Sequence, residues 1–506
     1  MAVQTPFDES LDTSHLHADL KRRSVRGGLV TLFSQGAQFV MQSVATIVLA
    51  RLLVPADFGI VAMVTAITGL ASAFADFGLS EATIQRKEIT HEQVSTLFWI
   101  NVAIGVGLTA ATAAIAPLLA RFYREPRLLG ITLVLSLTFI IGGLRVQPNA
   151  LIRRQMRFTA LAIRDILAYL VAVPVAIVMA VRGYRYWALV ALPLTLNFVQ
   201  MGISWLVVKW RPGLPSRAAQ IASMVKFGGN VSASYVVLNL NRSLDSILVG
   251  WYWGAAPLGL YSRAYNLLML PVRQLSGPAG SVAIPSFSRL QDSPKRFARY
   301  FLGAVSLLAW ITAPVFGFLF VAAKPVIALV LGNKWVDAAP VFQILVISAL
   351  GQLLLESTVW LFVSRGQSNR LLQILLLISP LLALSYAIGL PFNIKGVALS
   401  GSVALVVLLP WMLSFSFRGT ELSLKRLGRT LVFPISICLV SILVSNIALR
   451  FTQPHQIWLQ LLMPAAAFLA TYAASLLIPA IRTELTSFRE ILGAFETSRA
   501  SNEQST

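Results

Sequence analysis

The sequence predicts an all-α membrane protein that crosses the bilayer about fourteen times. Of its 506 residues, 57% are hydrophobic and only 12% are charged, whereas a soluble domain carries about 25% charged residues. The apolar residues fall in runs of about 20 or more, the length that an α-helix needs to cross the hydrocarbon core. These two observations exclude a soluble enzyme, a fibrous protein and a disordered chain.

Hydropathy over windows of about 19 residues predicts the spans in chain order. The first six form an N-lobe over 25–208, at 28–50, 57–79, 95–119, 128–149, 160–181 and 187–208. The next six form a C-lobe over 228–417, at 228–250, 258–282, 299–323, 340–363, 369–391 and 394–417. A further pair within 418–481 lies at 430–449 and 457–481. The remaining segments are a tail over 1–24, an inter-lobe linker over 209–227 and a polar tail over 482–506.

The distribution of basic residues predicts the orientation. If the N-terminus is cytoplasmic, inner segments hold 26 lysines and arginines and outer loops hold nine. Because basic residues concentrate in cytoplasmic loops, we expect a multi-pass protein of the bacterial inner membrane with both termini in the cytoplasm. The outer run over 121–127, with three arginines, is the local exception. The first 24 residues lack a short apolar core and a small-residue cleavage site, so we expect the first span to act as its own insertion signal.

Several function classes are disfavoured by what the chain contains. The net charge of +21 is spread over short connectors, so we expect no nucleic-acid partner. The single cysteine, Cys438, and the four histidines form no metal-ligand pattern, so we expect no metal and no cofactor. No lysine precedes Ser or Thr, which rules out a Walker A loop. The connectors are short and carry no catalytic pattern, so we expect the protein not to be an enzyme.

An internal repeat relates the two predicted lobes. Val25-Arg26 recurs as Val225-Lys226, and Phe58-Gly59 recurs as Leu258-Gly259, both at an offset of 200 residues. Each repeat contains six spans, and an even number gives both halves the same orientation. The sequence therefore predicts two lobes related by a pseudo-two-fold axis along the membrane normal.

Polar stripes run along the first and seventh spans, which the repeat equates. At helical spacing they contain Thr31, Gln35, Gln38, Gln42 and Thr46, and then Asn230, Ser234, Asn241 and Asp245. One interpretation is hydrogen bonding between helices, worth about 0.6 kcal/mol per contact. The other is a water-filled central cleft, which the length and repetition of the stripes favour.

Four carboxylates lie in or near the spans, where charge is expensive and commonly functional. Asp165 stands beside Arg164 and is interpreted as half of an interfacial pair. Asp245 lies three residues from Arg242, which allows an ion pair on one helix face. Asp76 lies near a span end, where solvation and function are equally good interpretations. Glu356 has no charged neighbour in its own helix, so we expect it to titrate or to couple cation movement.

Intramembrane arginines suggest an anionic cargo. Arg263 and Arg273 share the eighth span with Pro271 and Pro278, which predict a kinked helix. Guanidinium groups capture phosphate or carboxylate with two parallel hydrogen bonds. We therefore expect these residues to contact a negatively charged lipid headgroup.

Four segments resemble the polysaccharide transporter family, the lipid-linked oligosaccharide flippases of the multidrug/oligosaccharidyl-lipid/polysaccharide exporter superfamily. They are RLLVPADFGIVAM at 51–63, FADFGLSEATIQRKE at 74–88, LNRSLDSILVGWYWGAAPLGLYSRAYNLLMLP at 240–271 and VAIPSFSRLQD at 282–292. The resemblance implies two six-helix lobes around a central cavity, plus a C-terminal helix pair. It also implies export of an undecaprenyl-pyrophosphate-linked glycan for capsule, exopolysaccharide or O-antigen assembly.

The resemblance further implies charged residues that line the cavity, with membrane lipids, a polysaccharide polymerase and a co-polymerase as partners. For the headgroup we expect Arg242, Arg263, Arg273, Gln35, Gln38, Gln42 and Asn241. For ion coupling or gating by alternating access we expect Glu356, Asp245 and Asp76. Two alternatives stay open: a multidrug or cation antiporter of the same superfamily, and an integral-membrane sugar ligase or polymerase.

Overall fold

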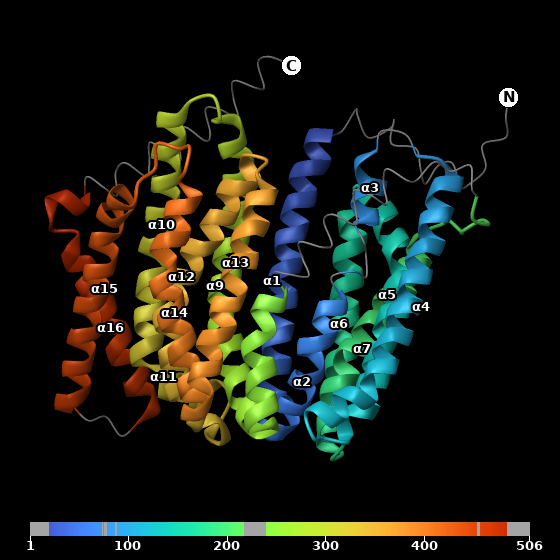
Figure 1. Cartoon of the computed structure of the whole chain (residues 1–506), viewed down its shortest axis with the longest axis horizontal. Coiled ribbons are helices and arrows are strands. Elements are labelled where there is room, and N and C mark those ends of the chain that lie inside the picture. The colour runs from blue at the N-terminus through green and yellow to red at the C-terminus, as the bar shows by residue number, and fades with distance from the viewer. Residues whose placement is uncertain are drawn as a thin grey trace. The chain divides into compact units, whose positions relative to one another are not determined.

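The computed structural model describes residues 20–72, 74, 78–86, 89–216, 239–452 and 456–482. The described residues form helices, turns and short connections with no strand, which confirms the predicted all-α class (Figure 1). The elements that the first part of the chain forms are α1 (Leu20–Leu52), α2 (Pro55–Ser72), α3 (Leu79–Gln85), α4 (His91–Phe122), α5 (Arg127–Arg154), α6 (Phe158–Val181), α7 (Tyr186–Val207) and a helix over 239–253. The second part forms α9 (Ala255–Arg289), α10 (Pro294–Val321), α11 (Ala323–Val330), η4 (Asn333–Ala338), α12 (Ala339–Ser364), α13 (Ser368–Gly389), η5 (Leu390–Phe392), α14 (Asn393–Ser416), α15 (Leu424–Thr452) and α16 (Ile457–Ser475).

Eleven apolar segments in the described part of the chain are long enough to cross a membrane. The stretch Asn369–Ser416 counts once among them, although it contains the separate helices α13 and α14. α9 is not among the eleven, because its sequence contains Arg263, Arg273 and many small polar residues. The predicted span at 228–250 lies partly outside the described residues, as do Asp76, Asn230 and Ser234.

Several helices begin or end away from their predicted spans, and α2 and α9 show why. α2 ends at Ser72 instead of continuing to 79, and the short helix α3 follows Gly78, whose φ of 65° is left-handed. α9 continues from Ala255 to Arg289 through both internal prolines and exceeds the predicted span at each end. Membrane helices tolerate internal proline when neighbouring groups satisfy the freed carbonyls, and the kink expected at Pro271 and Pro278 stays a prediction.

The chain divides into two compact units, Met1–Gly259 and Leu260–Thr506. In the first unit, α4 and α5 lie side by side with their backbones in close approach (Figure 1). A Cβ added to Gly105 would lie 2.6 Å from the Phe139 carbonyl oxygen, and one added to Gly143 would lie 2.5 Å from that of Asn101. α4 begins with a capping box between Thr90 and Gln93, which satisfies its first backbone donors.

α2 and the start of α9 cross at a second close approach in the first unit. A Cβ on Gly59 would lie 1.7 Å from the Ala255 carbonyl oxygen, and a Cβ on Gly259 would lie 1.9 Å from that of Pro55. These glycines are the two that the internal repeat equates at an offset of 200. Each is required because the partner backbone occupies the space that any side chain would fill.

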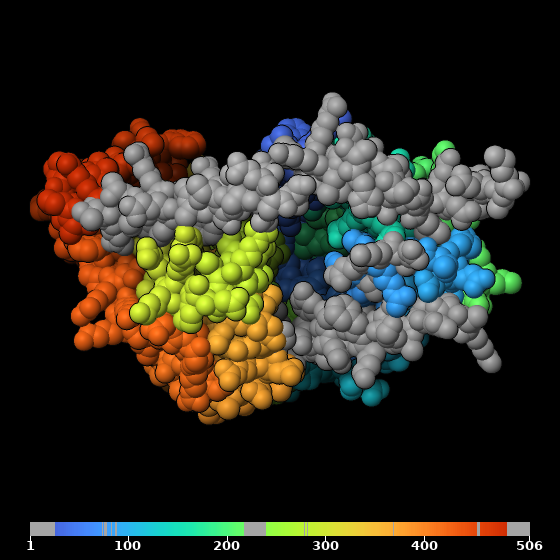
Figure 2. Space-filling view, turned by 90° about the horizontal axis from the view of Figure 1, so that it is seen from above, coloured from blue at the N-terminus to red at the C-terminus, as the bar shows by residue number. Residues whose placement is uncertain are grey.

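The second unit contains an apolar cluster from α9, α10, α12, α13, α14 and α15, in which Phe287 of α9 and Phe301 of α10 are fully buried. α9 and α12 meet at one end of this unit. There Ser288 Oγ donates to the Ser364 carbonyl oxygen at 3.2 Å, and Gln291 Nε2 donates to the same oxygen. Figure 2, seen from above, shows residues near 290 in yellow-green beside residues near 365 in gold.

Candidate functional site

The predicted glutamine stripe lies on an uncovered part of α1. Gln35 and Gln42 are exposed, and Gln38 is half-buried. Gln38 Nε2 donates to Ser34 Oγ at 3.0 Å, so this hydrogen bond stays within α1. Thr31 and Thr46 likewise donate to carbonyl oxygens of α1 itself. The stripe therefore makes its hydrogen bonds along its own helix and leaves the amides of Gln35 and Gln42 accessible.

The helix over 239–253 carries three predicted site residues of the first unit. Asn241 is half-buried, Arg242 is exposed, and Asp245 is 4% exposed. Asp245 Oδ1 accepts a hydrogen bond from the Ser246 amide at 2.6 Å. The buried carboxylate of Asp245 and the exposed guanidinium of Arg242 thus lie about one turn apart on the same helix.

In the second unit, α9 and α12 carry the remaining predicted residues. Arg263 is half-buried and Arg273 is exposed on α9, and Glu356 is half-buried on α12. A Cβ on Gly280 would lie 2.7 Å from the Trp360 indole nitrogen, so the two helices approach closely there. Arg273 precedes this approach by two turns on α9, and Glu356 precedes it by one turn on α12. The fold therefore places Arg273 and Glu356 on neighbouring helices of one unit.

A buried polar network, which the sequence interpretation missed, connects α5, α6 and α7. The Arg164 guanidinium pairs with the Asp165 carboxylate at 2.6 Å, as predicted, and Arg164 is only 6% exposed. Gln200 Nε2 of α7 donates to the same carboxylate at 3.0 Å, and Arg145 of α5 donates to the Gln200 side-chain oxygen. The pair is therefore the centre of a three-helix network.

Two further residues complete this network. Asn149 Oδ1 of α5 accepts from Arg164 and from the Ser204 hydroxyl of α7, the latter at 2.9 Å. Every buried polar group named here has a partner on another helix, which is the arrangement that makes such groups tolerable in an apolar interior. The one signal of this network in the sequence is that Arg145, Asn149, Arg164 and Gln200 occur inside apolar spans.

A second polar contact fixes the short helix α3 against α5. Thr83 Oγ1 donates to Gln147 Oε1 at 2.9 Å. Arg154 Nη1 donates to the Thr83 carbonyl oxygen at 3.0 Å and also to the carbonyl oxygen of Arg86. The guanidinium thus caps the C-terminus of α3, where a positive charge is favoured by the helix dipole.

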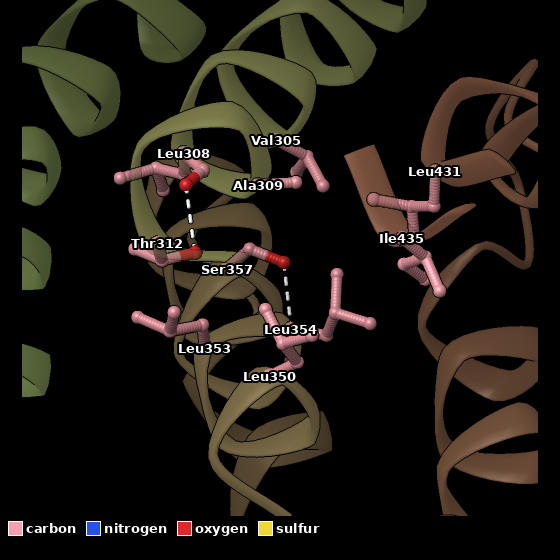
Figure 3. A pocket seen from close by; sticks show the side chains of 10 residues that line it. All are labelled: Val305, Leu308, Ala309, Thr312, Leu350, Leu353, Leu354, Ser357, Leu431 and Ile435. Atoms are coloured by element: carbon pink, nitrogen blue, oxygen red, sulfur yellow. Dashed lines mark hydrogen bonds between the residues drawn. The ribbon is translucent and has the colours of Figure 1, made fainter. Parts of the chain in front are cut away.

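An apolar cleft opens in the second unit between α10, α12 and α15 (Figure 3). It has a volume of only about 30 Å³, and its lining residues are Val305, Leu308, Ala309, Thr312, Leu350, Leu353, Leu354, Ser357, Leu431 and Ile435. The hydroxyls of Thr312 and Ser357 donate to carbonyl oxygens of their own helices, at 2.7 and 2.6 Å. The cleft is therefore suited to apolar groups and is not a place for a charged headgroup.

Metal chemistry finds no support among the residues that the structure describes. No group of three or more His, Cys, Asp or Glu side chains is close enough there to hold a metal ion. Cys438 is buried, and its thiol donates to the Ala313 carbonyl oxygen at 3.1 Å. The candidate site thus consists of arginines, carboxylates and amides on membrane helices.

Comparison with known proteins agrees with this description. A family model described as polysaccharide biosynthesis protein matches residues 48–340. The lipopolysaccharide biosynthesis protein WzxC of Escherichia coli (strain K12) is 28% identical over 309 residues, which cover 60% of this chain and 62% of that protein. The succinoglycan biosynthesis transport protein ExoT of Rhizobium meliloti (strain 1021) is 22% identical over 320 residues, which cover 63% of this chain and 64% of that protein. The match therefore spans less than two thirds of either relative.

A solved structure shares the fold. It is described as the lipid II flippase MurJ in an inward closed conformation, and it superposes with a TM-score of 0.69 at 12% sequence identity. The superposition covers 89% of this chain and 99% of that one. At this identity the likeness concerns the fold alone.

Proposed function

The chain belongs to the polysaccharide biosynthesis protein family, and on that premise we propose that it is a flippase for a lipid-linked oligosaccharide. The observation that carries the proposal is the family match over 48–340 in a chain with many membrane-crossing helices. The named relatives serve lipopolysaccharide and succinoglycan biosynthesis, and the fold is that of a lipid II flippase. The protein acts as a transporter and not as an enzyme.

The cargo is an undecaprenyl-pyrophosphate-linked glycan that moves from the inner to the outer leaflet of the bacterial inner membrane. Its headgroup combines two phosphates with sugars, while its polyprenyl tail stays in the lipid. Such a headgroup needs cationic and amide side chains along its path, because an unsolvated charge in hydrocarbon is expensive. A polymerase and a co-polymerase then receive the exported unit.

The headgroup path uses the exposed and half-buried polar residues of both lobes. The headgroup ligands are Arg242, Arg263, Arg273, Asn241, Gln35, Gln38 and Gln42. Both termini of the chain lie in the cytoplasm. Their support is that Gln35, Gln42, Arg242 and Arg273 are exposed on long helices, where a guanidinium can form two hydrogen bonds with a phosphate. The lobes rock to expose the path to alternate leaflets.

Ion coupling or gating falls to the carboxylates Glu356, Asp245 and Asp76. Asp245 is 4% exposed and accepts an amide hydrogen bond, so its protonation would change the local charge of an otherwise buried site. Glu356 is half-buried one turn from Trp360, at the contact between α9 and α12. A carboxylate in either place responds to a proton or a cation that reaches it.

Deletion of the gene in its bacterial host tests the proposal. We expect loss of a surface polysaccharide and accumulation of its lipid-linked repeat unit in the cytoplasmic leaflet. Normal polysaccharide together with drug sensitivity would instead establish the antiporter alternative. Polymer formed by the purified chain from lipid-linked units would establish the ligase or polymerase alternative.

Complementation with matched variants tests the site. Arg273→Gln should restore less than about a tenth of polymer export, because the lost phosphate contact contributes about 1.5–3 kcal/mol. Arg289→Gln is the control, because Arg289 is an exposed arginine in the last turn of the same helix. Equal export by the two variants, at equal protein levels in the membrane, contradicts a role for Arg273.

A further inference from the structure

The first unit carries a group of arginines at one end. Three short connections meet there, namely 53–54 between α1 and α2, 123–126 between α4 and α5, and 182–185 between α6 and α7. Contacts tie these connections together: Arg185 pairs with Asp57 at 3.6 Å, and Arg127 lies over the Tyr186 ring at 5.9 Å. The arginines of this end are Arg51, Arg121, Arg124, Arg127, Arg182 and Arg185, and we call them the arginine end.

Positive charge exceeds negative charge at the arginine end. Among the described residues of these connections and the adjoining helix turns, the acids are Asp57 and Glu125. Asp57 is 2% exposed and pairs with Arg185, and Glu125 pairs with Arg127 at 2.7 Å. Six arginines against two acids leave an excess of four positive charges on exposed side chains.

Helix stabilisation explains only part of this excess. Arg51 and Arg121 lie in the last turns of α1 and α4, where the helix dipole favours a cation. Arg124 lies beyond the last turn of α4, directly after its C-cap residue Tyr123, and its φ of 55° is left-handed. No ion pair forms between Arg124 and an acid among the described residues. Its exposed guanidinium is therefore open to an anion outside the chain.

Aromatic side chains share the arginine end. Trp251 and Tyr252, at the end of the helix over 239–253, are 48% and 52% exposed, and Tyr184 is 55% exposed. The Trp251 ring stacks on Phe122 with centroids 6.1 Å apart. Exposed Trp and Tyr at helix ends mark the level of the lipid headgroups. Because each connection has at most four residues, the arginines cannot reach far beyond that level.

We propose that the arginine end binds the phosphates of an anionic glycerophospholipid, such as phosphatidylglycerol, in the leaflet that it faces. All six basic residues are arginines and none is a lysine, and the planar guanidinium forms paired hydrogen bonds with phosphate oxygens. The exposed Trp and Tyr side chains beside the arginines place this end at headgroup depth, which favours a lipid over a soluble acidic protein. This lipid site is separate from the headgroup path of the cargo.

Lipid titration of the detergent-purified full chain, followed by native mass spectrometry, tests the proposal. The probe is dioleoyl phosphatidylglycerol, with dioleoyl phosphatidylcholine as the uncharged comparison. The test variant is Arg121→Gln/Arg124→Gln/Arg182→Gln, which removes three charges that pair with neither Asp57 nor Glu125. Each basic residue near an anionic lipid contributes about 1 kcal/mol, so we expect binding at least about tenfold weaker.

The matched control is Lys334→Gln/Lys395→Gln/Arg450→Gln, which removes the same charge from exposed residues of the second unit. It should bind phosphatidylglycerol within about twofold of the unaltered chain. Equal weakening in both variants, or equal binding of phosphatidylcholine, overturns the proposal. Displacement of the lipid by free glycerol phosphate at the lipid's own concentration also overturns it, because the site would then serve soluble anions.

A folding defect would be recognised by thermal unfolding of the same samples. If the glutamine variant unfolds early, Arg121→Lys/Arg124→Lys/Arg182→Lys replaces it, since this variant keeps every charge. Loss of the guanidinium fork should still weaken phosphatidylglycerol binding at least about threefold. Unchanged binding by a folded lysine variant contradicts the assignment to arginine.

Discussion

The first unit uses arginine in two opposite ways. In the network between α5, α6 and α7, Arg164 is 6% exposed and its partner Asp165 lies at 2.6 Å. At the arginine end, the Arg185 side chain is 62% exposed and its partner Asp57 lies at 3.6 Å. The buried guanidinium of Arg164 has hydrogen-bond partners within the protein, whereas the exposed arginines of the arginine end outnumber the acids beside them. Burial with a complete set of partners marks a structural arginine, and exposure with excess charge marks one that is available to a ligand.

The largest expected effect comes from stranding a charge in the buried network. Arg164→Met leaves the half-buried Asp165 carboxylate, which accepts a hydrogen bond from Gln200, without its cation. Removing one partner of a buried pair lowers the free energy of unfolding by about 3–5 kcal/mol. Thermal unfolding of the detergent-solubilised protein measures this loss as a lower melting temperature.

The double variant Arg164→Met/Asp165→Leu separates charge from packing. Replacing both partners by apolar side chains is often neutral, so this variant should be markedly more stable than Arg164→Met. Arg153→Met, at an exposed arginine in the last turn of α5, is the control and should change little. If Arg164→Met and Arg153→Met melt together, the distinction between buried and exposed arginines is wrong.

The glycine crossing near the arginine end should give the next largest effect. Gly59→Ala would place a Cβ 1.7 Å from the Ala255 carbonyl oxygen, so α2 and α9 would have to separate. Overpacking of this kind costs about 1–3 kcal/mol in the free energy of unfolding. The control is Gly69→Ala in the same helix, because a Cβ there meets nothing within 4 Å. Equal melting temperatures for the two variants would show that the crossing is not tight.

The arginine end itself should contribute little to stability. Arg121→Gln/Arg124→Gln/Arg182→Gln removes exposed side chains that pair with neither nearby acid. Surface substitutions of this kind change the free energy of unfolding by about 0.5 kcal/mol or less each. The melting temperature measured without added lipid should therefore stay close to that of the unaltered chain. A large drop would mean that these arginines have a structural role like that of Arg164.

The smallest effect concerns pH at the same end. The hydrogen bond from Arg127 lowers the pKa of Glu125 below its ordinary value of 4.5. A lowered pKa in the folded state adds stability above the unfolded value, and this stability is lost as the pH falls through the folded value. The contribution is a fraction of about 1 kcal/mol, because the Arg127 side chain is 44% exposed. The difference between the melting temperatures at pH 7 and below pH 4 should be slightly smaller for Glu125→Gln than for the unaltered chain.

The sequence predicted the fold class, the family and the approximate place of most helices, because a long apolar run has few alternatives to a membrane helix. It also identified Gly59 and Gly259 through the repeat, although not that each faces the other's helix. The sequence did not predict the polar network around Arg164. The Arg164–Asp165 pair lies on one helix, and its sequence does not reveal which neighbouring helices bring Asn149 and Gln200 to it. Which faces of α1 and α9 meet water stays a prediction.

The arginine end also bears on how the chain is made. In the predicted orientation, each arginine of this end must cross the hydrocarbon core during insertion, against a membrane potential that is negative inside. That work is about 2.3 kcal/mol for each charge per 100 mV. The hairpin of α4 and α5 delivers three arginines with one acid in a single connection, so its translocation is the most strongly opposed. Biogenesis of this protein should therefore slow when the cell is fully energised and quicken when an uncoupler collapses the potential.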